Sequence, residues 1–329
     1  MRSKILIIFI LCCASSPLTY GQIAETTYFE FHSNFWVNLH HFLYEKASNE
    51  QKGKLEEDRL AFEETGEKEA ISNLSPKDQE ILEKAISYYR DYMISQSLFR
   101  KLPSLTYALS QEGETIVAKG EISPSLADAL NLVAGPYRQH IWPVHDDYNK
   151  KVLSLHLDKI RKMEPSVISK MEELSLNEFP NSEKVRIDLS AYASWSGAYT
   201  ITDPFFNIYI SSLDPTSDAS EFIETVFHES THLLFRYGSP FRELSYNTAQ
   251  ELKVEQPRSF WHACLFYLCG KVVQQELQQF GIEHELVMDT KNIFSKVSTT
   301  TFRDSFDLYI SGELSAKEAL VTILNDLKP

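Results

Sequence analysis

The chain has 329 residues, of which 43% are hydrophobic, and its formal net charge is −14 at neutral pH. This length and apolar content are sufficient for one large domain or two smaller ones. The strong negative charge argues against nucleic acid and against an anionic membrane surface as partners.

The first residues predict export. Arg2 and Lys4 are followed by a ten-residue apolar run at 5–14, which is too short to span a bilayer. Small residues precede a candidate cleavage point after Gly21. We therefore expect residues 1–21 to be a signal peptide, the mature protein to be secreted or periplasmic, and no membrane span to be present.

Helical patterns dominate up to about residue 180. Residues 28–47 carry apolar side chains three and four positions apart, which predicts an amphipathic helix. Ser75 and Ser123 each precede a proline, and each pair predicts a helix start. A longer helix is expected over 135–163, and the histidines before residue 180 lack ligand spacing. We predict a helical N-terminal region over 22–180.

The pattern then changes to that of short strands. Apolar and polar residues alternate over 185–190 and 206–211, and 198–202 is a further β-like stretch, so three strands are expected. A helix follows, with Asp218 as its expected N-cap and Gly238 as its expected end. A second buried helix is expected after Ser259. The predicted fold class is α+β and predominantly helical, with a small antiparallel or mixed sheet before these two helices.

The first of the two helices contains the motif His228-Glu229-x-x-His232. Side chains four apart lie on one face of a helix, so both imidazoles can reach one Zn²⁺ at roughly 2.0–2.1 Å. Glu229 lies to the side, where it can take a proton from a metal-bound water. The helix is otherwise apolar, and its buried polar groups need partners, which a metal ion or backbone carbonyls would supply.

The segment FHESTHLLF resembles the active-site helix of the zincin metallopeptidases. The resemblance implies zinc held by His228 and His232, Glu229 as general base, and hydrolysis of a peptide or protein substrate. It covers this helix and the strands before it, so residues 181–329 are expected to form a zincin-like catalytic region. In that family an edge strand pairs with the extended substrate, and 198–211 is the region expected to provide it.

A catalytic zinc takes three protein ligands and leaves one position for water. The metzincin position, six residues after His232, holds Gly238 and not histidine. His262, a polar residue in the first turn of an otherwise apolar helix, is the first candidate for the third ligand. Glu251 and Glu255 are the alternatives, and His262 would then be a transition-state donor or a core histidine.

Two functions are compatible with these residues. The first is a secreted zinc-dependent hydrolase, specifically a metallopeptidase, in which zinc and Glu229 activate water. The second is a zincin-fold binding or scaffold protein without turnover, although a structural site has no need of the base. The oxyanion donor is left open among four tyrosines, Tyr199, Tyr209, Tyr237 and Tyr246. No sequence feature indicates an oligomeric state.

Overall fold

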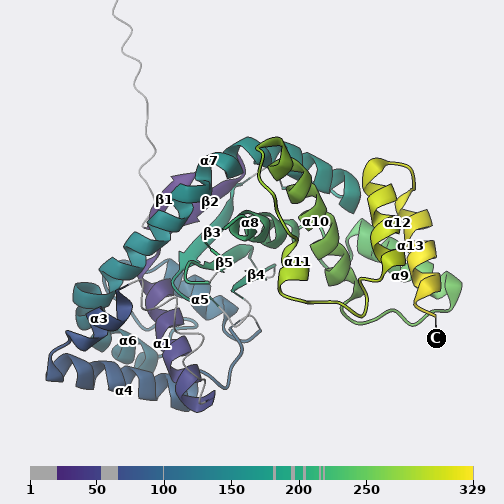
Figure 1. Ribbon diagram of the computed structural model, residues 1–329. Coiled ribbons are helices and arrows are strands. Elements are labelled where there is room, and N and C mark those ends of the chain that lie inside the picture. Colours follow the sequence, from purple (N-terminus) through teal and green to yellow (C-terminus); the bar gives the residue numbers. More distant parts are fainter. Residues whose placement is uncertain are drawn as a thin grey trace, which may run out of the picture.

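The computed structural model describes residues 21–52, 66–98, 100–180, 183–193, 197–202, 205–214, 216–217 and 219–328. Within these residues the fold is α+β, as predicted, with one five-stranded mixed sheet and helices on both of its faces (Figure 1). The strands are β1 (Gln22–Glu25), β2 (Phe29–His32), β3 (Val185–Ser190), β4 (Ala198–Ile201) and β5 (Asn207–Ser211).

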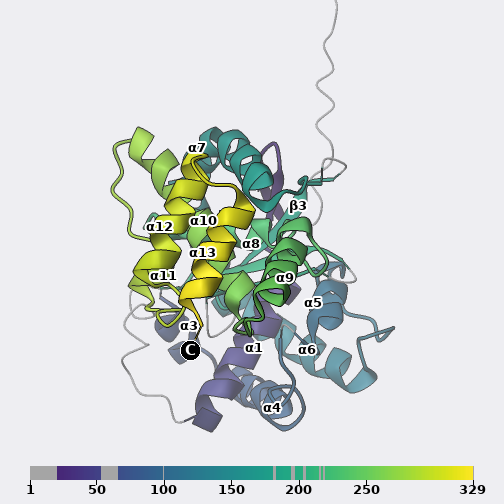
Figure 2. The same ribbon diagram turned by 90° about the vertical axis from the view of Figure 1, so that its right-hand side faces the viewer.

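The helices fall into two groups separated by the sheet. The first group comprises α1 (Phe35–Lys52), α3 (Glu67–Ser72), α4 (Pro76–Tyr92), α5 (Pro103–Ser110), α6 (Pro124–Pro136) and a π-helical turn, η2 (Tyr137–Ile141). The second comprises α7 (Trp142–Ser175), α8 (Glu221–Thr231), α9 (Pro240–Leu252), α10 (Phe260–Gln279), α11 (Val287–Thr290), α12 (Thr300–Ser311) and α13 (Ala316–Asp326). Figure 2 shows α9, α12 and α13 together beside α10.

The strand order is β1-β2-β3-β5-β4. The three central strands are parallel, whereas β1 and β4 lie antiparallel at the two edges. An edge strand therefore lies in the region where one was expected, and it is β4. Its position next to β5 leaves its other side without a neighbouring strand among the described residues.

The expectation of one helix over 28–47 was wrong for its first part. Residues 29–32 form β2 and pair with β3, and α1 begins at Phe35. Phe29 and Phe31 alternate with Glu30, and both rings are fully buried beneath the sheet. The sheet therefore takes strands from both sides of residue 180, so the expected helical N-terminal region also contributes β1 and β2.

The sheet separates two hydrophobic cores. Phe29, Val185, Ile187 and Ile208 point to one face, where α7 and α8 lie on the sheet and α10 packs against both helices. The opposite face carries Tyr209 and lies against α1 and the helices packed around it. Because neighbouring side chains of a strand point to opposite faces, the same strands line both cores.

The long helix α7 continues past its expected end near residue 163 and runs through Pro165 to Ser175. A proline inside a helix costs about 3 kcal/mol. Met163, Val167 and Ile168 flank it, and all three are fully buried, each contributing roughly 1.5–3 kcal/mol. Burial in the core shared with α8, α10 and the sheet therefore outweighs the local penalty, and the helix stays continuous.

Two of the expected helix starts are confirmed, whereas the N-cap of α8 is Ser220 and not Asp218. The side chain of Ser75 accepts a hydrogen bond from the Asp78 amide at the start of α4, and Ser123 does the same at α6. The expected N-cap Asp218 and residues 1–20 of the expected signal peptide lie outside the described residues. In the part that is described, no helix is long and apolar enough to cross a membrane.

Candidate metal centre

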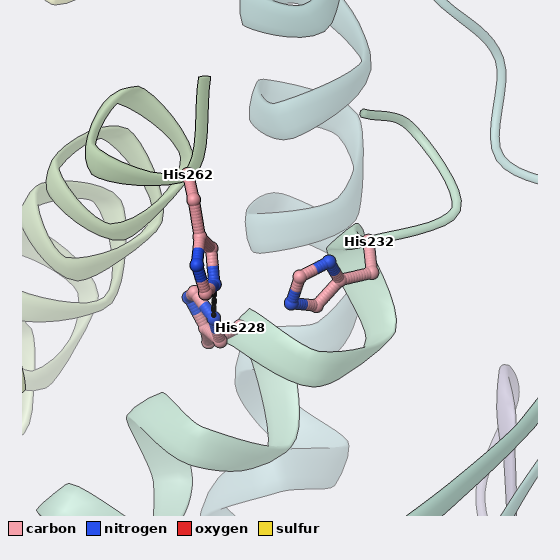
Figure 3. A group of neighbouring side chains, drawn as sticks. All are labelled: His228, His232 and His262. Atoms are coloured by element: carbon pink, nitrogen blue, oxygen red, sulfur yellow. Dashed lines mark hydrogen bonds between the residues drawn. The ribbon is translucent and has the colours of Figure 1, made fainter. Parts of the chain in front are cut away.

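Three histidines converge where α8 meets α10. His228 lies in the last turn of α8, His232 is its C-cap residue, and His262 lies in the first turn of α10. Figure 3 shows all three imidazoles pointing toward one another. The ring centroids are separated by 5.0, 5.3 and 5.1 Å, and one ligand atom from each residue lies within 4.8 Å of the others.

The backbone explains how the first two rings come to share a face. The α-helix ends at Thr231, earlier than the expected stop at Gly238. His232 nevertheless keeps helical torsions, with φ −52° and ψ −28°, so its side chain follows His228 around the axis by four residues. The end of α8 therefore retains the geometry on which the motif depends.

The spacing fits a metal ion. The Nε2 atoms of His228 and His262 lie 3.3 Å apart. Two nitrogens that each lie roughly 2.0–2.1 Å from a tetrahedral Zn²⁺ are separated by about 3.3 Å from one another. In the described part of the chain, His228, His232 and His262 are the one group of three or more histidine, cysteine or acidic residues that could hold a metal ion.

The environment keeps the three imidazoles in the neutral form that binds metals. Burial lowers the pKa of His228 and of His232 well below the usual value, and the neighbouring imidazoles act in the same direction. Burial also lowers the pKa of His262 to about 4. All three are therefore uncharged at neutral pH, as metal ligation by histidine requires.

Aromatic rings surround the histidine cluster. The Phe266 ring lies 3.7 Å from the ring of His228, and the Trp261 ring lies 5.0 Å from that of His262. Phe294 contacts His262 at 5.4 Å between centroids and has a positive φ of 59°, a conformation that bulky residues rarely adopt. These contacts restrict the side-chain torsions of the histidines and reduce the local dielectric.

Glu229 lies beside this cluster and is only 8% exposed. One of its carboxylate oxygens lies 3.9 Å from Nε2 of His232. Thr200, on the edge strand β4, donates its hydroxyl hydrogen bond to that carboxylate and lies 3.0 Å from the Glu229 carbonyl oxygen. Burial raises the pKa of Glu229 to about 7, while Thr200 and the charge of Lys291 act in the opposite direction.

Helix α8, which carries the motif, is held in place by Glu224, one turn before His228. Glu224 is fully buried there, and one of its carboxylate oxygens accepts hydrogen bonds from His284 at 2.6 Å and from the Val287 amide at 3.0 Å. Ser220 Oγ lies 2.8 Å from the other nitrogen of His284. Gly270 of α10 leaves space for the second carboxylate oxygen. This contact sets the distance between α8 and α10.

The alternative ligands lie elsewhere. Glu251 is on the surface, where its carboxylate pairs with Lys317 at 2.8 Å and is 60% exposed. Glu255 is also exposed. Neither glutamate belongs to the group of possible metal ligands, whose third member is His262.

Two of the four candidate oxyanion donors are also excluded by position. The Tyr199 hydroxyl bonds to His41 of α1 at 2.9 Å, on the face of β4 opposite to Thr200. Tyr209 stacks on Tyr199 in the same core at 4.8 Å. Tyr237 and Tyr246 are largely exposed.

Three histidines of the N-terminal region have partners within the fold. His40 bonds to Tyr89 at 2.7 Å, and His41 bridges the Val37 carbonyl and Tyr199. His145 bonds to the buried Glu67 at 2.7 Å, in a network that also includes Lys46 and Tyr192. Each of these groups links helices or loops within the second core.

Sequence reasoning missed two residues beside the cluster, Thr200 and Trp261. Strand alternation placed Thr200 on the face opposite to Tyr199, but only the packing of α8 on that face shows its contact with Glu229. Trp261 precedes His262 directly, and this adjacency was the one available signal. Comparisons with models of known families, with curated proteins and with solved structures found no match.

Proposed function

We propose that this protein is a secreted zinc-dependent hydrolase of the zincin type that cleaves peptide bonds. The observation that carries the proposal is the convergence of His228, His232 and His262, with ligand atoms within 4.8 Å and Glu229 beside them. Three neutral imidazoles are a ligand set typical of catalytic zinc. Zinc bound there would supply a Lewis acid and an acidified water.

The chain's own residues support the remaining roles. Glu229 is buried beside the cluster and has a pKa raised to about 7, which suits a group that takes a proton from water and returns it to the leaving amine. Thr200 orients the carboxylate through its hydroxyl. The edge strand β4 carries Thr200, so a substrate paired with β4 would lie next to Glu229.

The test is substitution of the base. Glu229→Gln keeps the shape of the side chain but cannot accept a proton, so zinc content should be retained while peptide cleavage falls by roughly 10²–10⁴. Glu221→Gln, two turns earlier on the same helix, is the matched control and should cleave like the parent.

The measurement is cleavage of a broad peptide library by the mature protein, with and without a chelator, alongside metal analysis of each variant. Chelator-sensitive cleavage by the parent and its loss in Glu229→Gln are expected. Equal cleavage by parent and Glu229→Gln contradicts the assigned base, and the absence of cleavage by a zinc-loaded parent favours the scaffold function.

A further inference from the structure

A cation lies beside the histidine cluster. The guanidinium of Arg242, on α9, stacks over the ring of Trp261 at 4.4 Å. The Trp261 ring in turn lies 5.7 Å from that of His232 and 5.0 Å from that of His262. The positive charge is therefore separated from the candidate metal centre by a single aromatic ring.

This cation forms no ion pair among the described residues, and Glu243, the next residue in the chain, acts on it only through its charge at longer range. Its one hydrogen bond there runs from Nη1 to the Phe235 carbonyl at 3.4 Å, and no carboxylate lies within 4.0 Å. Lys291, the other cation that acts on the site, is paired with Asp214 at 3.3 Å.

The stacking also prepares the guanidinium for binding. A guanidinium carries five N–H donors in a planar fork that matches a carboxylate, and four of them remain beyond the bond to Phe235. Contact with Trp261 fixes the plane of the fork, so less side-chain entropy is lost when an anion binds. Trp261 thus holds the charge next to the site without neutralising it.

We propose that Arg242, held on Trp261, determines specificity by binding a carboxylate of the peptide substrate. The inference rests on the proposed function of the histidine cluster. Arg242 lies 4.4 Å from the Trp261 ring, and that ring lies 5.7 Å from the ring of His232. An extended peptide advances about 3.3–3.6 Å per residue, so these two distances together correspond to about three residues. The carboxylate that Arg242 binds should therefore lie within about three residues of the cleaved bond. An acidic side chain and a free C-terminus both offer this group.

The experiment uses pairs of peptides that differ only in one carboxylate. In each pair Asp is replaced by Asn, Glu by Gln, or a free C-terminus by its amide, at each position within three residues of the cleaved bond. The ratio of kcat/KM for the carboxylate and amide peptides is measured with the zinc-loaded parent. We expect a ratio of about 10–100 at one position, because hydrogen bonds to charged groups have that effect on binding.

Arg242→Gln should bring this ratio close to one, mainly through KM, whereas Arg242→Lys should retain part of it because the charge remains. Arg138 is the matched control, since its guanidinium stacks on Phe35 at 4.1 Å in the other core. Arg138→Gln should show the parent's ratio. Because the ratio of kcat/KM values is taken within each variant, it does not depend on how much of that variant is folded.

A second arm separates this proposal from the proposed function. Zinc-loaded Glu229→Gln is titrated with fluorescent peptides in carboxylate and amide forms, and binding is followed by anisotropy. Preferential binding of the carboxylate form that is lost with Arg242→Gln supports the role of Arg242, even when the parent cleaves nothing. Chelator-sensitive cleavage without charge preference overturns it, as does equal binding of both forms. The position of the effective carboxylate distinguishes a side chain from a C-terminus.

Discussion

The contact between α8 and α10 predicts that a methyl group at Gly270 is harmful. A Cβ atom there would lie 2.9 Å from a carboxylate oxygen of Glu224 and 3.1 Å from Cγ of Leu286. The first distance is shorter than any normal contact, so one side must move. Glu224 is constrained because its other oxygen is bound to His284 and to the Val287 amide.

Two opposing effects determine the size of the change. Alanine in place of glycine inside a helix contributes about 0.5–1 kcal/mol of stability. Overpacking a buried site costs about 1–3 kcal/mol, and a displaced Glu224 weakens its charged hydrogen bonds. We expect Gly270→Ala to lower the free energy of unfolding by roughly 1–2 kcal/mol.

Gly135 provides the matched control. It also lies in a helix, α6, but a Cβ atom there meets nothing within 4 Å. Alanine gains helix propensity at this position, but the ring of Pro136 crowds a Cβ atom on the preceding residue, so Gly135→Ala should raise the free energy of unfolding by up to about 0.5 kcal/mol. Urea titrations followed by circular dichroism, on metal-free protein, measure both changes. A stabilising effect of Gly270→Ala equal to that of Gly135→Ala would show that Glu224 is free to move and does not fix the helix.

Three further outcomes are expected. His262→Ala should weaken zinc binding by orders of magnitude, whereas Glu251→Ala should keep its zinc. Metal analysis of the folded variants measures both, and the reverse result would assign the third ligand to Glu251. Chelation should lower Tm, because zinc present at 100 times its Kd stabilises by about 2.7 kcal/mol, and an unchanged Tm argues against the metal site. Burial alone would raise the pKa of Glu67, but Lys46 and His145 lower it to about 2. The stabilisation by ionised Glu67 is therefore present above the unfolded pKa of 4.5 and is lost as pH falls toward 2. In acid titrations of the free energy of unfolding, Glu67→Gln should lose less stability over that range than the parent. An equal loss in the two proteins would contradict this account.

Some features follow from residues close together in the sequence. Ser75 and Ser123 begin helices because each side chain bonds to an amide three residues later. The alternation over 185–190 specifies β3 because one pleated strand must place its apolar side chains on one face. His228 and His232 share a face because they are four residues apart on a helix, whatever packs around them. In each case the interaction is local, so the sequence contains the whole signal.

Other features depend on contacts between distant segments. The four residues of β2 are a strand because β3 pairs with them. Helix α7 passes Pro165 because α8, α10 and the sheet together bury its apolar face. The sequence left His262, Glu251 and Glu255 as alternatives for the third ligand. Only the packing of α10 on α8 brings His262 beside the other two histidines, while both glutamates are exposed. Arg242 likewise acquires its position from Trp261 on another helix. Tertiary structure decided these points because burial and pairing are properties of two surfaces in contact, and one stretch of sequence describes only one of them.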